Sequence, residues 1–285
     1  MRDHHEGQRV SRRTVFAGLS AIGLTGLLAA CGDSTPVTTT TGETVTPEAT
    51  TSADLTDLFA GANTCTLTPS ATQGPYYFDA DKIRADIRED RAGSRLRLAV
   101  KVQDSETCAP LPNAVVEIWH CDADGLYSGA ESQSTGSGGP PPGGGPPEGA
   151  PPRGRPGGTA QGGEGAADMT PTDDKRYLRG AQVTNADGIV EFTTVWPGWY
   201  RGRTVHIHAM VHVDNERVLT TQLMFDEALN SAVFAGTPYS ARTGRDTFND
   251  GDSIFEEQML LKVTEEDDGH LGVIVFSADS DRDGA

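Results

Sequence analysis

The chain has 285 residues, of which 41 are Asp or Glu and 23 are Lys or Arg, so its formal net charge is −18 at pH 7. A surface this acidic repels the phosphates of nucleic acids and the headgroups of anionic lipids, and we expect neither as a partner. The average charge does not constrain a small aromatic ligand, because the charges that line a pocket can differ from those of the whole surface.

Residues 1–30 have the features of an export signal. Arg12 and Arg13 lie in the sequence Ser-Arg-Arg-Thr-Val-Phe, which resembles a twin-arginine signal, and residues 17–30 carry no charge. This uncharged stretch is short for a transmembrane helix. It ends in Leu-Ala-Ala-Cys, which resembles the cleavage site of bacterial lipoproteins. We expect an extracytoplasmic protein that is attached to the membrane only through a lipid on Cys31, while a plain cleaved signal or an uncleaved anchor are the alternatives.

Two segments are too poor in apolar residues to form a packed structure. Residues 31–62 are rich in threonine, and we expect them to form a disordered tether. Residues 131–168 contain 13 glycines and 8 prolines among 38 residues. Because segments typical of strands lie on both sides of residues 131–168, we expect this stretch to be a disordered insertion within one domain.

The remaining sequence is typical of β-structure. Between Arg95 and Val102, apolar and polar residues alternate, which predicts a strand with one buried face. Helices are expected only at 79–91 and 227–234. Several short strands with turns between them predict an all-β protein with a single β-sandwich domain over residues 63–281, followed by a tail of residues 282–285. The other strands are expected at 114–120, 189–195, 204–213, 218–225, 258–264 and 273–277.

Three cysteines follow Cys31, namely Cys65, Cys108 and Cys121. Export makes a disulfide plausible. If residues 113–120 form a strand, Cys108 and Cys121 lie beyond its opposite ends, about 25 Å apart at ~3.3 Å per residue. A disulfide requires Cα atoms within about 7 Å. We therefore expect Cys65 to pair with one of the other two.

The sequence Tyr-Arg-Gly-Arg-Thr-Val-His-Ile-His occupies residues 200–208. In an extended strand successive side chains point to opposite faces, so His206 and His208 share one face. The opposite face is apolar. This pattern predicts a metal site on a β-scaffold, with the core on the other side of the strand. The apolar face consists of Val205, Ile207, Ala209 and Val211.

This stretch is one of five motifs that follow each other in a characteristic order. Together the motifs resemble those of the intradiol ring-cleavage dioxygenases, the non-haem Fe(III) family that includes the catechol and protocatechuate dioxygenases. Only five residues separate Tyr200 from His206, whereas the protocatechuate enzymes have a longer loop there. The shorter loop resembles the exported branch of the family. The motifs are Gly-Pro-Tyr-Tyr at 74–77, Val-Glu-Ile-Trp-His-Cys-Asp-Ala-Asp-Gly-Leu-Tyr at 116–127, Leu-Arg-Gly at 178–180, Pro-Gly-Trp-Tyr-Arg-Gly-Arg-Thr-Val-His-Ile-His at 197–208 and Thr-Gln-Leu at 221–223.

The resemblance implies four ligands for Fe(III), and they fall on Tyr127, Tyr200, His206 and His208. Phenolate is a hard anionic donor that suits Fe(III), and imidazole binds iron as a neutral donor. A free tyrosine has a pKa near about 10, but a bound trivalent cation favours the ionised form. Two phenolates and one hydroxide would leave the ferric site neutral, which lowers the cost of burying it.

The resemblance also implies the roles of three residues during catalysis. Tyr200 matches the tyrosine that the substrate displaces. Arg203 matches the arginine that stabilises negative charge on the activated substrate, and Gln222 matches a glutamine that lies behind the ligands. A guanidinium placed opposite developing negative charge lowers the energy of the transition state.

The implied reaction is cleavage of a catechol-type aromatic diol by O2 between its two hydroxylated carbons, giving a muconate-type diacid. Catechol, protocatechuate, hydroxyquinol and lignin fragments remain open as substrates, as does the oligomeric state. One alternative is an exported lipoprotein that holds zinc or copper through His206 and His208 without dioxygenase activity. Another is a membrane-anchored β-sandwich interaction module with a degenerate site. The presence of both tyrosines, Tyr127 and Tyr200, together with Arg203 and Gln222 favours the enzyme.

Several other polar and aromatic residues receive structural interpretations. His120 is expected to be packed or hydrogen-bonded, and His212 to lie at a pocket rim or on the surface. Tyr76 and Tyr77 are expected at the mouth of the pocket or in a packed turn. Tryptophan side chains at 196 and 199 are expected to pack around the metal-binding loop.

Overall fold

The computed structural model describes residues 37–38, 44–45, 55–59, 65–134, 168–282 and 284. The expected export signal, Cys31 and most of the expected tether lie outside these residues, as do residues 135–167 of the expected insertion. Within the described ranges, no helix is long and apolar enough to cross a lipid bilayer.

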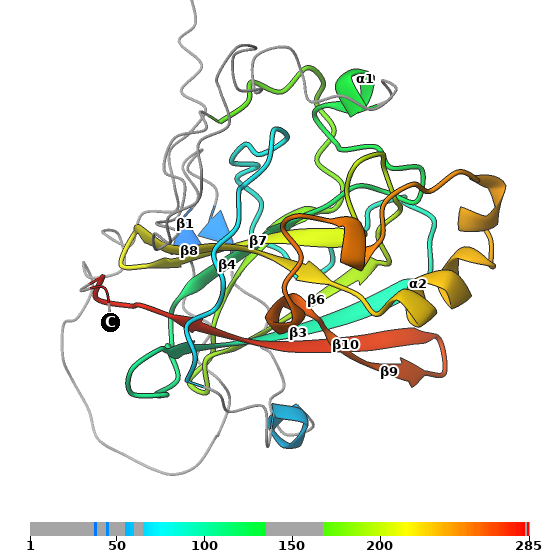
Figure 1. Ribbon diagram of the computed structural model, residues 1–285. Helices are drawn as coiled ribbons and strands as arrows, with labels where there is room; N and C mark the ends of the chain where they lie inside the picture. Colours follow the sequence, from blue (N-terminus) through cyan, green and yellow to red (C-terminus); the bar gives the residue numbers. More distant parts are fainter. Residues whose placement is uncertain are drawn as a thin grey trace, which may run out of the picture.

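Two four-stranded sheets pack face to face and form a β-sandwich (Figure 1). One sheet has the strand order β6-β3-β10-β9, in which β3 and β10 are parallel and the other neighbours antiparallel. The other sheet has the order β5-β4-β7-β8 and is antiparallel throughout. The predicted all-β sandwich is confirmed. The strands are β3 (Arg95–Asp104), β4 (Val115–Trp119), β5 (Arg179–Val183), β6 (Ile189–Val195), β7 (His206–Val213), β8 (Glu216–Met224), β9 (Lys262–Glu266) and β10 (Gly269–Ala278).

The helices that the structure describes are short. The predicted helix at 227–234 is confirmed as α2 (Glu227–Phe234), whose first turn is capped by the Asp226 carboxylate. The other helical elements are η3 (Thr56–Phe59), α1 (Glu131–Ser134), η4 (Tyr239–Ala241), η5 (Asn249–Gly251) and η6 (Glu257–Met259), and a two-stranded sheet pairs β1 (Val37–Thr38) with β2 (Thr44–Val45).

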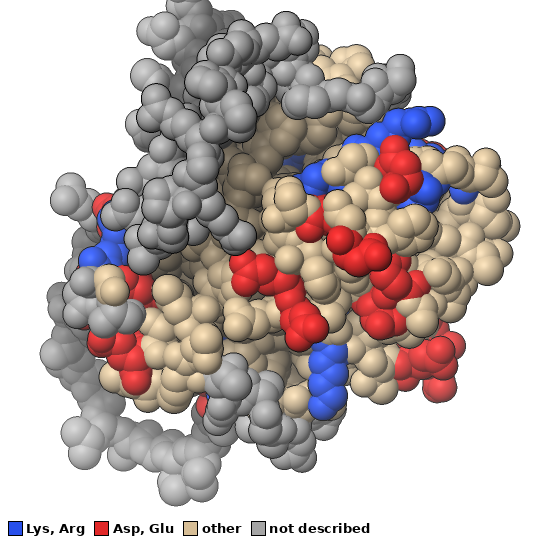
Figure 2. Space-filling model, viewed as in Figure 1, with Lys and Arg blue, Asp and Glu red and all other residues tan. Residues whose placement is uncertain are grey.

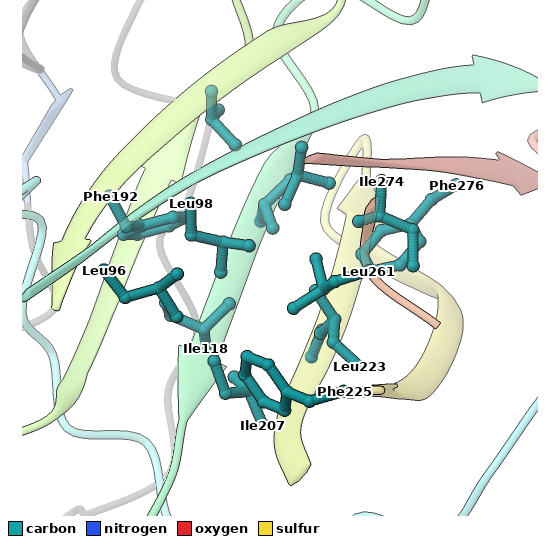
Figure 3. Packing of buried hydrophobic residues seen from close by; sticks show 14 of the residues in the cluster. Leu96, Leu98, Ile118, Phe192, Ile207, Leu223, Phe225, Leu261, Ile274 and Phe276 are labelled. Atoms are coloured by element: carbon teal, nitrogen blue, oxygen red, sulfur yellow. The ribbon is translucent and has the colours of Figure 1, made fainter. Parts of the chain in front are cut away.

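The main hydrophobic core lies between the two sheets and decides which face of β7 is left for chemistry. Leu98 and Phe192 come from one sheet and Ile118 from the other, and all three are fully buried (Figure 3). Ile207 points into the same core. Because side chains alternate along β7, the histidines at 206, 208 and 212 lie on the outer face of its sheet. The predicted separation of an apolar face from a histidine face is confirmed.

The predicted helix at 79–91 is wrong. This segment is not helical and runs past the edges of both sheets: the Arg84 N–H donates to the Ala181 carbonyl (3.0 Å), and the Ile87 N–H donates to the Thr193 carbonyl (3.0 Å). These bonds satisfy backbone groups that a helix would have paired internally. Ile87 is buried in the core. The apolar spacing that suggested a helix therefore reflects contacts with two sheet edges.

Two other strand assignments differ from the prediction. Residues 257–259 form η6, and the strand expected at 258–264 begins only at Lys262. Strand β5 was not predicted, because its sequence Arg-Gly-Ala-Gln-Val shows no alternation of apolar and polar residues.

Parts of the expected tether (residues 31–62) and of the expected insertion (residues 131–168) are folded. Leu55 and Phe59, within residues 31–62, are buried against Ala99, Ile189 and Leu271. Burial of these apolar side chains offsets the entropy of ordering the segment. At the other boundary, residues 131–134 form α1. The folded part of the chain therefore extends further at both of these boundaries than the sequence indicated.

A disulfide joins Cys65 to Cys108, with Cα atoms 5.3 Å apart, as one of the two expected pairings. Cys121 is buried and has a free thiol. From Cys65 the chain runs along both sheets: the Thr68 N–H donates to the Ser277 carbonyl of β10 (2.9 Å), and the Ala71 N–H donates to the Thr220 carbonyl of β8 (2.8 Å). This course brings residues 72–77 onto the outer face of β7.

On the face visible in Figure 2, acidic side chains are prominent, in line with the negative net charge of the chain. Acidic side chains gather over the middle of this face, and the basic side chains lie mostly near one edge.

Candidate metal centre

The four residues predicted as ligands come together on the outer face of β7. Nε2 of His206 lies 3.2 Å from Nε2 of His208, and the Tyr200 hydroxyl lies 3.0 Å from His206 Nε2. The Tyr127 ring lies 5.8 Å from the Tyr200 ring and 6.3 Å from the His208 ring. Tyr127, from the loop after β4, thus meets Tyr200 and both histidines although it precedes them by more than 70 residues.

Both histidines are neutral and present ring nitrogens to the same point. His206 Nδ1 lies 2.7 Å from the Thr204 carbonyl, which can only accept, so Nδ1 carries the proton and Nε2 offers its lone pair. Burial, followed by the positive charge of Arg203, lowers the pKa of His206 to about 3. Burial likewise holds the pKa of His208 well below its usual value. Neutral imidazole is the form that binds a metal ion.

Two neighbours fix the ring of His208. The Trp119 indole stacks on it with 5.0 Å between ring centroids and 3° between planes. Gly74 has φ +72°, and a Cβ atom there would lie 2.9 Å from His208 Cε1. The backbone of Gly74, in the Gly-Pro-Tyr-Tyr motif, therefore packs directly against the His208 ring. A residue with a Cβ atom would not fit there, which explains the glycine.

Replacing Gly74 with alanine is expected to displace the His208 ring and to weaken metal binding about 10- to 100-fold, which is the usual effect of disturbing the support of a ligand. The measurement is titration of the metal-free protein with iron. Gly244→Ala is the matched control, because Gly244 also has a positive φ (+90°) but open space around its Cα. Equal iron affinity in the two variants would refute the steric role of Gly74.

The two tyrosines are neutral in the absence of a cation. Burial, aided by the neighbouring Tyr200, raises the pKa of Tyr127 well above its usual value. Burial likewise raises the pKa of Tyr200. The Tyr127 hydroxyl is buried without a hydrogen bond of normal geometry. A buried phenol in this state is costly, and a metal ion that binds its ionised form would relieve that cost.

The donor set fits ferric iron. Two nitrogens bound to one metal ion at about 2.1 Å each lie about 3.0–3.4 Å apart in octahedral or tetrahedral geometry, and the two Nε2 atoms meet this spacing. Among the described residues, no group of three or more His, Cys, Asp or Glu side chains could hold a metal ion. The Tyr200 hydroxyl lies 3.0 Å from His206 Nε2 and the Tyr127 ring lies 5.8 Å from the Tyr200 ring, so both phenols could supply oxygen ligands, and phenolate oxygen favours Fe(III).

Arg203 and Gln222 lie beside the histidines. Gln222 is directly opposite His208 in the register of β7 and β8. Arg203 Nη2 donates to Gln222 Oε1 at 2.5 Å, and Gln222 Nε2 donates to the Thr72 carbonyl at 3.2 Å. The backbone of residues 72–74, the strand pair β7–β8 and the loop before β7 thus meet at one place.

The remaining residues singled out from the sequence lie around the site or away from it. His120 is buried and lies 2.7 Å from the Thr194 hydroxyl and from the Cys121 carbonyl, as expected of a packed histidine. His212 is buried further along the outer face, with an exposed fraction of 7%. The Tyr76 ring packs on the Tyr127 ring at 4.7 Å.

Three more aromatic residues have packing roles. Tyr77 packs on Trp119 at 4.7 Å and donates its hydroxyl hydrogen bond to Glu117. Trp196 and Trp199 belong to the core between the sheets.

Two residues near the site were missed from the sequence. Trp119 lies within a motif, but nothing in its type indicated that it stacks on His208. Asp252, which accepts a hydrogen bond from Arg203 Nε at 2.9 Å, lies in a stretch without periodicity or motif.

Known proteins with similar sequences and structures share one chemistry. No protein-family model matches the chain. A chlorocatechol 1,2-dioxygenase from Rhodococcus opacus is 24% identical over an alignment of 185 residues. The alignment covers 56% of this chain, and the chain spans 56% of the length of that curated relative. In structure, the chain is similar to an intradiol ring-cleavage dioxygenase from Tetranychus urticae, with 30% identity and a TM-score of 0.62. That similarity covers 76% of this chain and 96% of the Tetranychus urticae protein.

Proposed function

Since the chain belongs to the intradiol ring-cleavage dioxygenases, we propose that it opens the ring of a catechol-type aromatic with O2 at a ferric iron. The observation that carries this proposal is the convergence of two neutral imidazoles and two phenols on one point. The product is a muconate-type diacid that contains both atoms of O2, so the reaction consumes no external reductant.

His206 and His208 hold the metal ion in this proposal. When bound, ferric iron supplies a Lewis acid that draws electron density from the two catechol oxygens and makes the ring reactive toward O2. The two imidazoles stay neutral because they are buried. The Thr204 carbonyl keeps the lone pair of His206 Nε2 directed at the site.

Tyr200 is the residue that we expect to take a proton from the substrate. It lies on the loop before β7 and is only partly buried, whereas Tyr127 is 1% exposed and packed under Tyr76. The less enclosed phenol is the one that can move. Because burial raises the pKa of Tyr200, its ionised form is a strong base for a catechol hydroxyl proton.

Arg203 and Gln222 stabilise negative charge on the substrate ring. The Arg203 guanidinium lies against Gln222, next to His208. A positive charge fixed before the reaction stabilises the electron-rich ring without reorganising. The aromatic side chains of Tyr76, Tyr77 and Trp119 pack in one cluster with Tyr127 and Tyr200, which limits the access of water from that side.

Visible absorption and oxygen uptake test this proposal. The iron-loaded protein is expected to be burgundy from phenolate-to-iron charge transfer, and to consume O2 with at least one member of a panel of catechol, protocatechuate, hydroxyquinol and lignin-derived diols. Protein that stays colourless after iron loading, or a complete lack of turnover across the panel, would contradict the proposal.

Replacing Tyr127 with phenylalanine is expected to bleach or strongly shift this absorption band, because one of the two phenolate donors is removed. Tyr177→Phe is the matched control: Tyr177 is also buried, but its hydroxyl donates to Glu131 at 2.7 Å, away from the ligands. A spectrum that is unchanged in Tyr127→Phe would show that Tyr127 is not a ligand.

We also propose that the protein acts outside the cytoplasm, bound to the membrane by a lipid on Cys31. The twin-arginine sequence and the Leu-Ala-Ala-Cys box support this, as does the disulfide between Cys65 and Cys108, which is typical of oxidising compartments. Mass spectrometry of the mature N-terminus is expected to find a lipidated Cys31, and an unmodified N-terminus upstream of Cys31 would contradict it.

A further inference from the structure

Asp252 is a buried carboxylate directly behind the catalytic arginine. Its side chain is 1% exposed. Oδ2 accepts hydrogen bonds from Arg203 Nε (2.9 Å) and from the Thr204 N–H (2.8 Å), and Oδ1 accepts one from the Ile254 N–H (2.9 Å). One carboxylate oxygen therefore accepts hydrogen bonds from both the Arg203 side chain and the backbone of the next residue.

The other end of the Arg203 guanidinium contacts Gln222, next to the candidate metal centre. Its Nη2 donates to Gln222 Oε1, and Gln222 lies opposite His208 in the strand pair. Arg203 belongs to the loop between β6 and β7, where no strand pairing fixes it. A free arginine side chain has about 2 kcal/mol of rotamer entropy to lose. With Asp252 bound to Nε, the guanidinium plane is fixed and Nη2 is directed at Gln222.

The position of Asp252 is itself determined by rigid elements. The Thr204 hydroxyl donates to Asn249 Oδ1 at 2.6 Å, and Asn249 Nδ2 donates to the Phe225 carbonyl at 2.8 Å, directly after β8. The Asn249 N–H donates to Glu227 at the start of α2. The segment that carries Asp252 is thus tied to the end of β8 and to α2.

Asp252 is ionised at neutral pH. Burial alone would raise its pKa, but the N–H groups of Ile254 and Thr204 and the charge of Arg203 outweigh burial and lower the pKa. The carboxylate offsets part of the charge of Arg203. Asp252 therefore does not add to the positive charge at the site. Its role is to fix the orientation of the Arg203 guanidinium.

We propose that Asp252 is a positioning residue that fixes the Arg203 guanidinium between Gln222 and the site of ring cleavage. The consequence for catalysis rests on the function proposed above. The geometric part of the proposal is that Arg203 keeps its place only while Asp252 holds the guanidinium. This part does not depend on the proposed function.

The test is a double-mutant cycle of Asp252→Asn and Arg203→Gln on the iron-loaded full chain. Asp252→Asn is expected to lower kcat for catechol about 10- to 100-fold with little change in KM, and to have no further effect in the Arg203→Gln background. Asp246→Asn is the matched control: Asp246 accepts from the Gly202 N–H in the same loop but pairs with the exposed Arg201 instead. Additive effects in the cycle would overturn the proposal, since a merely structural loss does not depend on Arg203.

Two further measurements keep the proposal falsifiable. Arg203→Lys retains the charge but cannot bond Asp252 and Gln222 through one planar group, so it is expected to be as impaired as Arg203→Gln; full activity would show that charge alone suffices. Crystal structures of wild type and Asp252→Asn do not depend on turnover. Displacement of Arg203 from Gln222 in the variant supports the proposal even if the wild type opens no catechol, and an unmoved Arg203 overturns it.

Discussion

Replacing His208 with glutamine is expected to lower the affinity for iron at least about 100-fold and to abolish ring cleavage. His208 Nε2 lies 3.2 Å from His206 Nε2, and the Trp119 ring and the Gly74 backbone fix its orientation. Glutamine has a similar length, but its neutral amide is a much weaker ligand for iron than imidazole. Because even disturbed support of a ligand costs about 10- to 100-fold in metal affinity, loss of the ligand itself costs more. Iron content after dialysis and the visible absorption band measure this effect.

His212→Gln is the control for that variant. His212 lies on the same face of β7, four residues further along and also buried, but outside the group of four proposed ligands. The same exchange there is expected to leave the iron content and the absorption band as in the wild type. Iron loss in both variants, or in neither, would contradict the assignment of His208 as a ligand.

Replacing Arg203 with glutamine is expected to lower kcat about 100- to 1,000-fold while the protein keeps its iron. Removing one preorganised group that stabilises developing charge typically costs about 2.7–4 kcal/mol in the transition state. Arg203 is placed for this role by two contacts, to Gln222 at 2.5 Å and to Asp252 at 2.9 Å. Steady-state oxygen uptake gives kcat, and the absorption band reports the iron independently.

Arg201→Gln removes an equal charge two residues earlier in the same loop. The Arg201 side chain is 60% exposed and lies 3.8 Å from Asp246, so solvent screens its charge. Its kcat is expected to stay within about twofold of the wild type, because exposed ion pairs contribute little. If the two arginine variants lost activity equally, the net charge of the loop would matter and the placement of Arg203 would not.

The sequence was sufficient to predict that the two histidines share one face, because both lie in a regular strand. His206 and His208 alternate with the apolar residues of β7, and this pattern alone assigns the histidines and the core to opposite faces. Tyr127 could be added only through the resemblance of its motif. No periodicity connects it to β7, since the loop after β4 brings it there by long-range packing.

Features that depend on partners far away in the sequence could not be predicted. Residues 79–91 are not helical because the edges of β5 and β6 supply their hydrogen-bond partners. Leu55 and Phe59 are ordered by an apolar surface that forms only when β3, β6 and β10 are together. Asp252 gains its role solely from the loop that packs against it. In each case tertiary contacts override weak local preferences.

The identity of the product formed from catechol tests the central claim most directly. The iron-loaded protein is incubated with catechol and O2, and the product is identified by NMR and mass spectrometry. Cleavage between the two hydroxylated carbons predicts a muconate diacid that carries both atoms of O2, with the yield lost in His208→Gln and retained in His212→Gln. A semialdehyde, formed by cleavage beside the two hydroxylated carbons, would contradict the account, as would recovery of catechol and of every other diol in the panel unchanged under the same conditions.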